Sequence, residues 1–173
     1  MPSSTPLTQS LGVEDIWKNP QLAGPTLSRS GKCLAATAPN RGRMNLLVLD
    51  METRKGDLLT SFDDFDVINV SWLGDDRLMF SLGQNNSPTG PGQFDGGGLF
   101  VVNRDGTNFR RLSATVREMR NKNQFVYRGM ELFRIIPGNT DEVIVAGNLT
   151  NAESRDLYRL NLNTGRTVSL SLG

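Results

Sequence analysis

Three stretches of the chain share one pattern of apolar and polar positions and align without a gap. In each, an apolar run ends in Asp or Asn four residues after its first leucine, and a second leucine, followed by Thr or Ser, comes thirteen residues after the first. The stretches are Leu46 to Thr60, Leu99 to Ser113 and Leu157 to Ser171. Short runs that are apolar at both parities are typical of strands covered on both faces. The pattern therefore predicts the same hairpin three times.

Polar residues at the end of each run favour a turn. Short Asx side chains can hydrogen-bond the backbone two residues on, and a following glycine supplies conformational freedom. The Asx residues are Asp50, Asn103 and Asn161, and the glycines are Gly56, Gly106 and Gly165. The glycines lie at different distances from the first leucine, so the turn types are expected to differ.

A weaker pair of strands precedes each hairpin. Each pair has a short apolar run, a polar turn and a second apolar run, which predicts another hairpin. These pairs cover Leu27 to Thr37, Val70 to Ser81 and Phe133 to Ala146. The first leucine recurs after 53 and then 58 residues, a spacing that suits a repeated four-stranded unit. The prediction is an all-β fold, a partial β-propeller of about three four-stranded antiparallel blades.

The predicted organisation is a short leading segment followed by one repetitive domain. Residues 1–24 lead into the propeller, which occupies residues 25–173 in units of about 25–62, 67–115 and 130–173. Trp72 and Phe100 fall in strands of the middle unit, so both are expected to pack against adjacent sheets.

Three units raise the question of what covers the two ends. Propellers close with typically about 4–8 blades, and residues 1–24 are too few for a fourth blade. An open arc would leave two apolar faces, and such faces tend to find partners. The expectation is end-to-end self-association, for example a dimer completing a six-blade ring, or a marginally stable terminal unit.

The amino-acid composition limits the classes of partner and the cellular locations that are expected. Lys plus Arg is 19 against 18 for Asp plus Glu, so the net charge of +1 gives no electrostatic reason to expect nucleic acid or a membrane surface as partner. The single cysteine, Cys33, lies in an apolar run and is expected to be a buried thiol. No window approaches the ~18 apolar residues of a membrane span. Residues 1–11 also lack the pattern of a signal peptide, which favours the cytoplasm or a chain whose export signal has been removed.

Catalytic chemistry is mostly missing. The chain has no histidine, so it cannot form a Ser-His-Asp or Cys-His arrangement, and no catalytic, cofactor-binding or metal-ligating residue is assigned. Two acidic clusters, Asp63–Asp66 and Asp75-Asp76, could in principle serve acid–base chemistry or calcium binding. Their places between units and in a strand-connecting turn favour solvated loops instead.

Three further segments carry weaker signals. The glycine-rich run at residues 89–98 lacks the spacing of a phosphate loop and precedes a strand, so it is interpreted as a long loop suited to partner contacts. Residues 116–128 mix basic and aromatic side chains, which could contact RNA or single-stranded DNA, but a solvated connector is favoured. Asn69, Asn85 and Asn148 open Asn-x-Ser/Thr sequons, which are unremarkable in this composition.

Two N-terminal phrases and several strand phrases resemble a known family. Gly12–Pro20 and Leu27–Ala35 are similar to the start of the β-propeller in bacterial prolyl oligopeptidase-family serine peptidases, often labelled dipeptidyl aminopeptidase or acylaminoacyl-peptidase. Those proteins commonly read V-E-D-F-F-x-N-P and then L-S-P-D-G-K-x-L-A. Here Ile16-Trp17 replaces the two aromatics, and Arg29-Ser30 replaces Pro-Asp. The phrases at 45–50, 76–81 and 97–106 fit the same family.

The resemblance implies a propeller that caps a C-terminal α/β-hydrolase domain and filters the peptides that reach a Ser-Asp-His site. These 173 residues contain neither histidine nor a G-x-S-x-G elbow, so no catalytic residue is carried over. No counterpart of the acidic pair that holds a substrate's amino terminus is recognisable, so no binding residue is carried over either. The resemblance also favours a periplasmic or secreted location.

Two functions from different classes remain. The chain is either the propeller portion of such a peptidase, gating peptide access to a hydrolase domain, or a free-standing TolB-like or WD-like interaction module without enzymatic activity. An adjoining α/β-hydrolase coding region would support the first, and a stop codon after Gly173 would favour the second.

Overall fold

The computed structural model describes residues 21–84, 96–124 and 126–171, and it confirms the all-β prediction. Twelve strands of the described chain form three four-stranded antiparallel sheets in chain order. The first sheet contains β1 (Ala23–Leu27), β2 (Cys33–Asn40), β3 (Arg43–Asp50) and β4 (Gly56–Leu58). The second contains β5 (Asp66–Leu73), β6 (Arg77–Gly83), β7 (Gly97–Asn103) and β8 (Arg110–Thr115). The third contains β9 (Met130–Ile135), β10 (Glu142–Gly147), β11 (Asp156–Asn161) and β12 (Thr167–Ser169).

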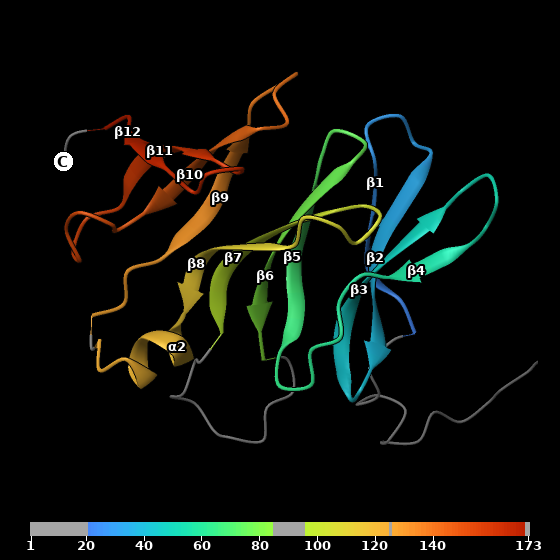
Figure 1. Ribbon diagram of the computed structural model, residues 1–173, viewed down its shortest axis with the longest axis horizontal. Helices are drawn as coiled ribbons and strands as arrows, with labels where there is room; N and C mark the ends of the chain where they lie inside the picture. Colours follow the sequence, from blue (N-terminus) through green and yellow to red (C-terminus); the bar gives the residue numbers. More distant parts are fainter. Residues whose placement is uncertain (1–20, 85–95, 125, 172–173) are drawn as a thin grey trace, which may run out of the picture.

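The sheets lie side by side like propeller blades, with β5–β8 between the other two (Figure 1). The middle sheet is apolar on both faces because it has a neighbour on each side. Leu78, Phe80 and Phe100 belong to the core shared with the first sheet, whereas Met79 and Leu99 belong to the core shared with the third. This placement explains why the middle strands are apolar at both parities.

Trp72 and Phe100 are packed as the sequence predicts. They are 7% and 5% exposed, and both belong to the core between the first and second sheets. Within this core the Phe100 ring stacks on Phe80, with the ring centroids 5.3 Å apart.

Hydrogen bonds explain the repeated Asx residues. The Asp50 carboxylate accepts from the Thr53 backbone N–H at 2.7 Å, and the Asn161 amide oxygen accepts from the Thr164 backbone N–H at 2.9 Å. Both contacts are the local turns predicted for Asx side chains. Asn103 differs because Asp105 takes this role in its turn, accepting from the Thr107 backbone N–H at 2.9 Å.

The repeated Thr or Ser also has a structural role. The Leu46 N–H donates to the Thr60 hydroxyl at 2.9 Å, and the Leu157 N–H donates to the Ser171 hydroxyl at 2.8 Å. In the second sheet β8 is longer, so Ser113 lies within the strand and directly opposite Leu99. The hydroxyl therefore caps a strand amide in the two sheets whose last strand is short.

One backbone hydrogen bond recurs in every sheet and sets the structural equivalence of the repeats. The residue after each Asx donates its N–H to the carbonyl of the residue just before the second strand. The pairs are Met51 to Lys32 at 2.9 Å, Arg104 to Asp76 at 2.9 Å and Leu162 to Asp141 at 2.8 Å. The second residues of β2, β6 and β10 are therefore equivalent, as are the three repeated leucines.

A short helix, α2 (Val116–Asn121), begins the segment for which the sequence predicts a solvated connector, and its Met119 is buried. Its capping box pairs the Thr115 hydroxyl with the Glu118 N–H, and the Glu118 carboxylate with the Thr115 N–H at 2.9 Å. The Thr-x-x-Glu spacing that signals such a cap is present in the sequence. None of the described helices is long and apolar enough to cross a membrane.

Candidate functional site

A hollow of about 710 Å³ lies where the three sheets meet. Its walls come from the first strands of all three sheets and from the turns that follow those strands. The lining residues are Thr26, Leu27, Arg29, Val70, Ser71, Trp72, Gly74, Asp75, Asp76, Ile135, Ile136, Pro137, Gly138, Asn139 and Thr140. Because residues more than a hundred positions apart build it, the hollow exists only in the assembled arc.

Trp72 anchors the boundary between the first two sheets beside the hollow. Its indole N–H donates to the Thr26 carbonyl at 2.9 Å, which satisfies a donor that burial would otherwise leave unpaired. The bond joins β5 to β1. It therefore holds the first strands of the two sheets in a definite relation.

Two backbone donors of the β1–β2 turn bind the β5–β6 turn. The Arg29 N–H donates to the Gly74 carbonyl at 3.2 Å, and the Ser30 N–H donates to the Asp75 carboxylate at 2.7 Å. Hydrogen bonding by the backbone and then the side chain of Ser30 lowers the pKa of Asp75. The neighbouring Asp76 pairs with the Arg104 guanidinium at 3.2 Å. The Asp75-Asp76 cluster thus serves the turns, in agreement with its interpretation as a loop.

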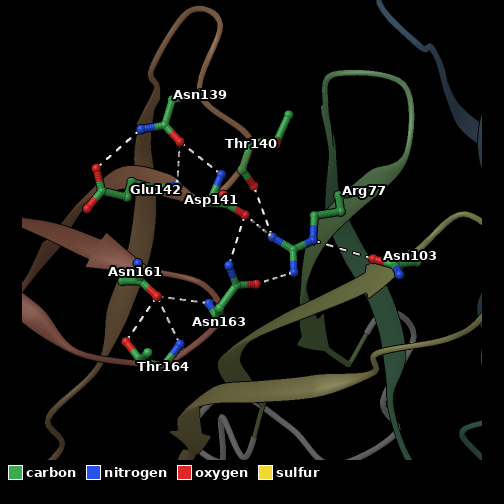
Figure 2. Close-up of polar contacts among 9 residues, drawn as sticks. All are labelled: Arg77, Asn103, Asn139, Thr140, Asp141, Glu142, Asn161, Asn163 and Thr164. Atoms are coloured by element: carbon green, nitrogen blue, oxygen red, sulfur yellow. Dashed lines mark hydrogen bonds and ion pairs between the residues drawn. The ribbon is translucent and has the colours of Figure 1, made fainter.

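Arg77 ties the second sheet to the third (Figure 2). One terminal nitrogen donates to the Thr140 carbonyl and to the Asp141 carboxylate, both at 3.1 Å. The other donates to the Asn163 amide oxygen at 2.5 Å, and Nε donates to the Asn103 amide oxygen at 3.4 Å. One planar guanidinium therefore holds both the β9–β10 turn, which lines the hollow, and the β11–β12 turn.

Asn139 shapes the same turn from within. Its amide oxygen accepts from the Asp141 and Glu142 backbone N–H groups at 2.9 and 3.0 Å (Figure 2). This local bonding presents the Thr140 carbonyl and the Asp141 carboxylate together to Arg77. The β9–β10 turn is thus ordered by its own side chains as well as by the neighbouring sheet.

The acidic cluster between the first two units is also used structurally. Asp64 accepts from Arg117 at 2.6 Å, and the Arg117 guanidinium lies 4.2 Å from the centre of the Phe65 ring. Asp66 is 1% exposed and accepts from the Met44 N–H at 2.8 Å. Asp66 is therefore buried in a strand rather than solvated, and the first arginine of the basic segment is bound to the acidic cluster. Phe125 lies outside the described residues.

The remaining predicted positions have structural explanations where the structure describes them. Cys33 is 3% exposed, as predicted for a buried thiol. The Asn148 amide oxygen accepts from the Gly129 N–H at 2.9 Å, and its amide nitrogen donates to the Tyr127 carbonyl at 2.7 Å. The side chain of this sequon therefore binds the backbone of the segment that precedes β9. Asn85 and residues 89–95 of the glycine-rich run lie outside the described residues. Over residues 21–84, 96–124 and 126–171, no cluster of three or more potential metal ligands occurs.

Sequence reasoning did not single out Arg77 as a site residue. The equivalent first residues of β2 and β10 are Cys33 and Glu142, so the repeat has no arginine signal at this position. Its partners lie up to 86 residues away. Only the folded arrangement reveals the contact.

Solved structures match most of the chain. Pyrococcus horikoshii acylaminoacyl peptidase matches with 14% sequence identity and a TM-score of 0.57, over 88% of this chain and 25% of the peptidase. TolB from Acinetobacter baumannii matches with 12% identity and a TM-score of 0.52, over 87% of this chain and 32% of TolB. A putative conserved lipoprotein from Clostridium novyi NT matches with 12% identity and a TM-score of 0.50, over 89% of this chain and 90% of that protein.

These matches define a fold class. The chain has a propeller-like β-domain, and it spans 25% of the peptidase and 32% of TolB. No protein-family model matches the sequence, and no curated protein matches it either. Because identities of 12–14% show the fold alone, and because such folds host many activities, function has to be argued from the site.

Proposed function

We propose that the chain is the propeller portion of a prolyl oligopeptidase-family serine peptidase and that it helps to admit peptides to a hydrolase domain. The observation that carries the proposal is the hollow, which all three sheets line and which the Trp72 and Arg77 contacts hold in shape. Similarity to part of an acylaminoacyl peptidase supports it. The role is binding and gating, since the chain offers no histidine for the chemical step.

The lining suits a peptide. Val70, Ile135, Ile136 and Pro137 provide apolar wall, which can receive a side chain of an extended segment. The charged lining residues are Arg29, Asp75 and Asp76, and Asp76 pairs with the Arg104 guanidinium, so positive and negative charges balance around the hollow. A neutral peptide with an aromatic or aliphatic residue is therefore the ligand class that the hollow favours.

Peptide binding is tested with Trp72 as the reporter. In a Trp17→Phe background, Trp72 is the sole tryptophan, and titration with acetyl-Ala-Ala-Phe-Ala-Ala-amide is expected to change its emission saturably. Ile136→Glu places a charge in the wall and should abolish the response. The matched control Val168→Glu, at a 63% exposed residue of β12, should leave it unchanged. A response of equal size in Ile136→Glu, or no saturable response, would exclude peptide binding at this hollow.

The chain by itself is expected to have no peptidase or esterase activity. It lacks both a histidine and a G-x-S-x-G elbow, and the loss of triad residues leaves only weak residual catalysis in serine peptidases. The measurement is hydrolysis of aminoacyl and dipeptidyl chromogenic esters and amides by the purified chain. Turnover that co-purifies with the chain and is blocked by a serine-directed reagent would contradict the expectation.

A second candidate, a free-standing interaction module, is favoured by one observation. The lipoprotein structure is matched over 90% of its length, so a domain of this extent also occurs without a large additional region. An antibody raised against the chain separates the two candidates in the source cells. A band much larger than 19.0 kDa supports a peptidase portion, and a band at 19.0 kDa supports the free-standing module.

A further inference from the structure

The first sheet has an apolar face that no other sheet of the described chain covers. We call it the leucine face, and it consists of Leu27, Leu34, Leu47, Leu49 and Leu58. In the strand register Leu34 lies opposite both Leu27 and Leu49, and Leu47 lies opposite Leu58. The face therefore extends across all four strands, at the end of the row of sheets that carries β1–β4 (Figure 1).

Local geometry confirms that these side chains share one face. A Cβ added to Gly56 of β4 would lie 3.5 Å from a Leu47 methyl and 3.7 Å from a Leu49 methyl. A Cβ at Gly56 would thus touch both leucines at ordinary van der Waals distance, as expected for side chains on one face. Leu27 is 55% exposed and Leu58 43% exposed, so the face is open at its edges.

The positions equivalent to Leu34 and Leu47 form contacts between sheets in the second and third sheets. The residue after the repeated leucine is Leu47 in the first sheet, Phe100 in the second and Tyr158 in the third. Phe100 and Tyr158 are 5% and 4% exposed because each packs against the preceding sheet. The second residues of β6 and β10, Leu78 and Val143, are both fully buried, whereas the equivalent Leu34 is partly exposed. The leucine face thus has the composition of a sheet-to-sheet contact but lacks its neighbour among the described residues.

At the opposite end of the arc, two arginines lie among apolar side chains such as Val168, which is opposite Arg159. On the outward face of the third sheet, Ile144 lies directly opposite Arg134 on one side and Arg159 on the other. The positions equivalent to Arg159 are Val48 and Val101, which are 6% and 1% exposed. Packing this face on leucines would remove two guanidinium groups from water while the leucines supply no carboxylate to pair with them, which is costly.

From this asymmetry, we propose that two copies of the chain associate through their leucine faces about a two-fold axis. The face carries no charged side chain among its five residues, so it can meet itself without like-charge repulsion. A head-to-tail contact would instead set Arg134 and Arg159 against the leucines. The arrangement therefore differs from the six-blade ring that the repeat count suggests.

The test is the oligomeric state of the full 173-residue chain, measured by light scattering after size exclusion from about 1 to 100 μM. The wild-type chain is expected to form a species of twice 19.0 kDa. Leu58→Lys should weaken the dimer at least about tenfold, because it places two lysines in one interface. Val168→Lys, on the outward side of the third sheet, should not change it. Circular dichroism melts establish that both variants are folded.

Three outcomes would overturn the proposal. One is a monomer across the whole concentration range. The second is association that Val168→Lys weakens as strongly as Leu58→Lys does, which is the signature of a head-to-tail contact, because that contact uses both faces. The third is a full-length monomer that dimerises only after deletion of residues 1–20, which would show that this segment covers the leucine face.

Discussion

Replacing Phe100 with alanine is expected to lower the free energy of unfolding by about 3–5 kcal/mol, the usual range for a buried phenylalanine. The ring is 5% exposed, stacks on Phe80 at 5.3 Å and meets the edge of the Phe62 ring at 6.3 Å. Truncation removes these contacts and leaves a cavity between two sheets that cannot easily close together. Trp72→Ala should have a similar effect, because it also removes the indole hydrogen bond to Thr26.

Urea unfolding at equilibrium measures this loss, with Phe109→Ala as the matched control. Phe109 belongs to the same aromatic cluster, 6.0 Å from Phe100, but it is 48% exposed. Its truncation is expected to cost no more than about 1.5 kcal/mol, since less apolar area returns to water. A loss below about 1 kcal/mol for both Phe100→Ala and Trp72→Ala would contradict the packing of the middle sheet.

Replacing Arg77 with methionine is expected to lower the free energy of unfolding by about 1.5–3 kcal/mol and to loosen the third sheet selectively. Methionine keeps much of the apolar stem but donates no hydrogen bond to the Thr140 carbonyl, Asp141 or Asn163. The Arg77 side chain is 16% exposed, so its contacts are screened less than those of a surface pair. Relative to the wild-type chain, amide hydrogen exchange in the native state of the variant should accelerate more in β9–β12 than in β1–β4.

Arg155→Met is the control for the loss of a cation. Arg155 pairs with Glu131 at the surface, where their side chains are 68% and 57% exposed, and such pairs contribute about 0–1 kcal/mol. Arg77→Lys keeps the charge but not the planar fork, so it should recover little of the loss. Full recovery by lysine, or equal exchange in all three sheets, would show that Arg77 is not the tie between the second and third sheets.

The candidate site was only partly predictable. The turns that line the hollow follow from local signals, such as Gly74-Asp75-Asp76 between two apolar runs. The sequence also indicated that Asp75-Asp76 serves a turn. It did not indicate that Ser30 would bind Asp75 across 45 residues, or that a helix, α2, would begin directly after Thr115. The first depends on the tertiary arrangement, whereas the second had a Thr-x-x-Glu signal within a segment assigned as a connector.

The amino-acid sequence by itself determined the strands, their order and their grouping in fours. These features are local, because an apolar run, an Asx turn and a capping Thr or Ser act within about fifteen residues, as Leu46 and Thr60 do. Only the tertiary structure decided which faces meet, where the hollow lies and that Arg77 joins two sheets. The contacts of Arg77 with the third sheet link residues 63 to 86 positions apart, and a single pair at such a distance leaves no periodic pattern in the chain. The tertiary structure also decided the exposure of the leucine face and of the arginines at the other end of the arc. Their positions repeat in the sequence, but their exposure depends on whether the sheet has a neighbour on that side.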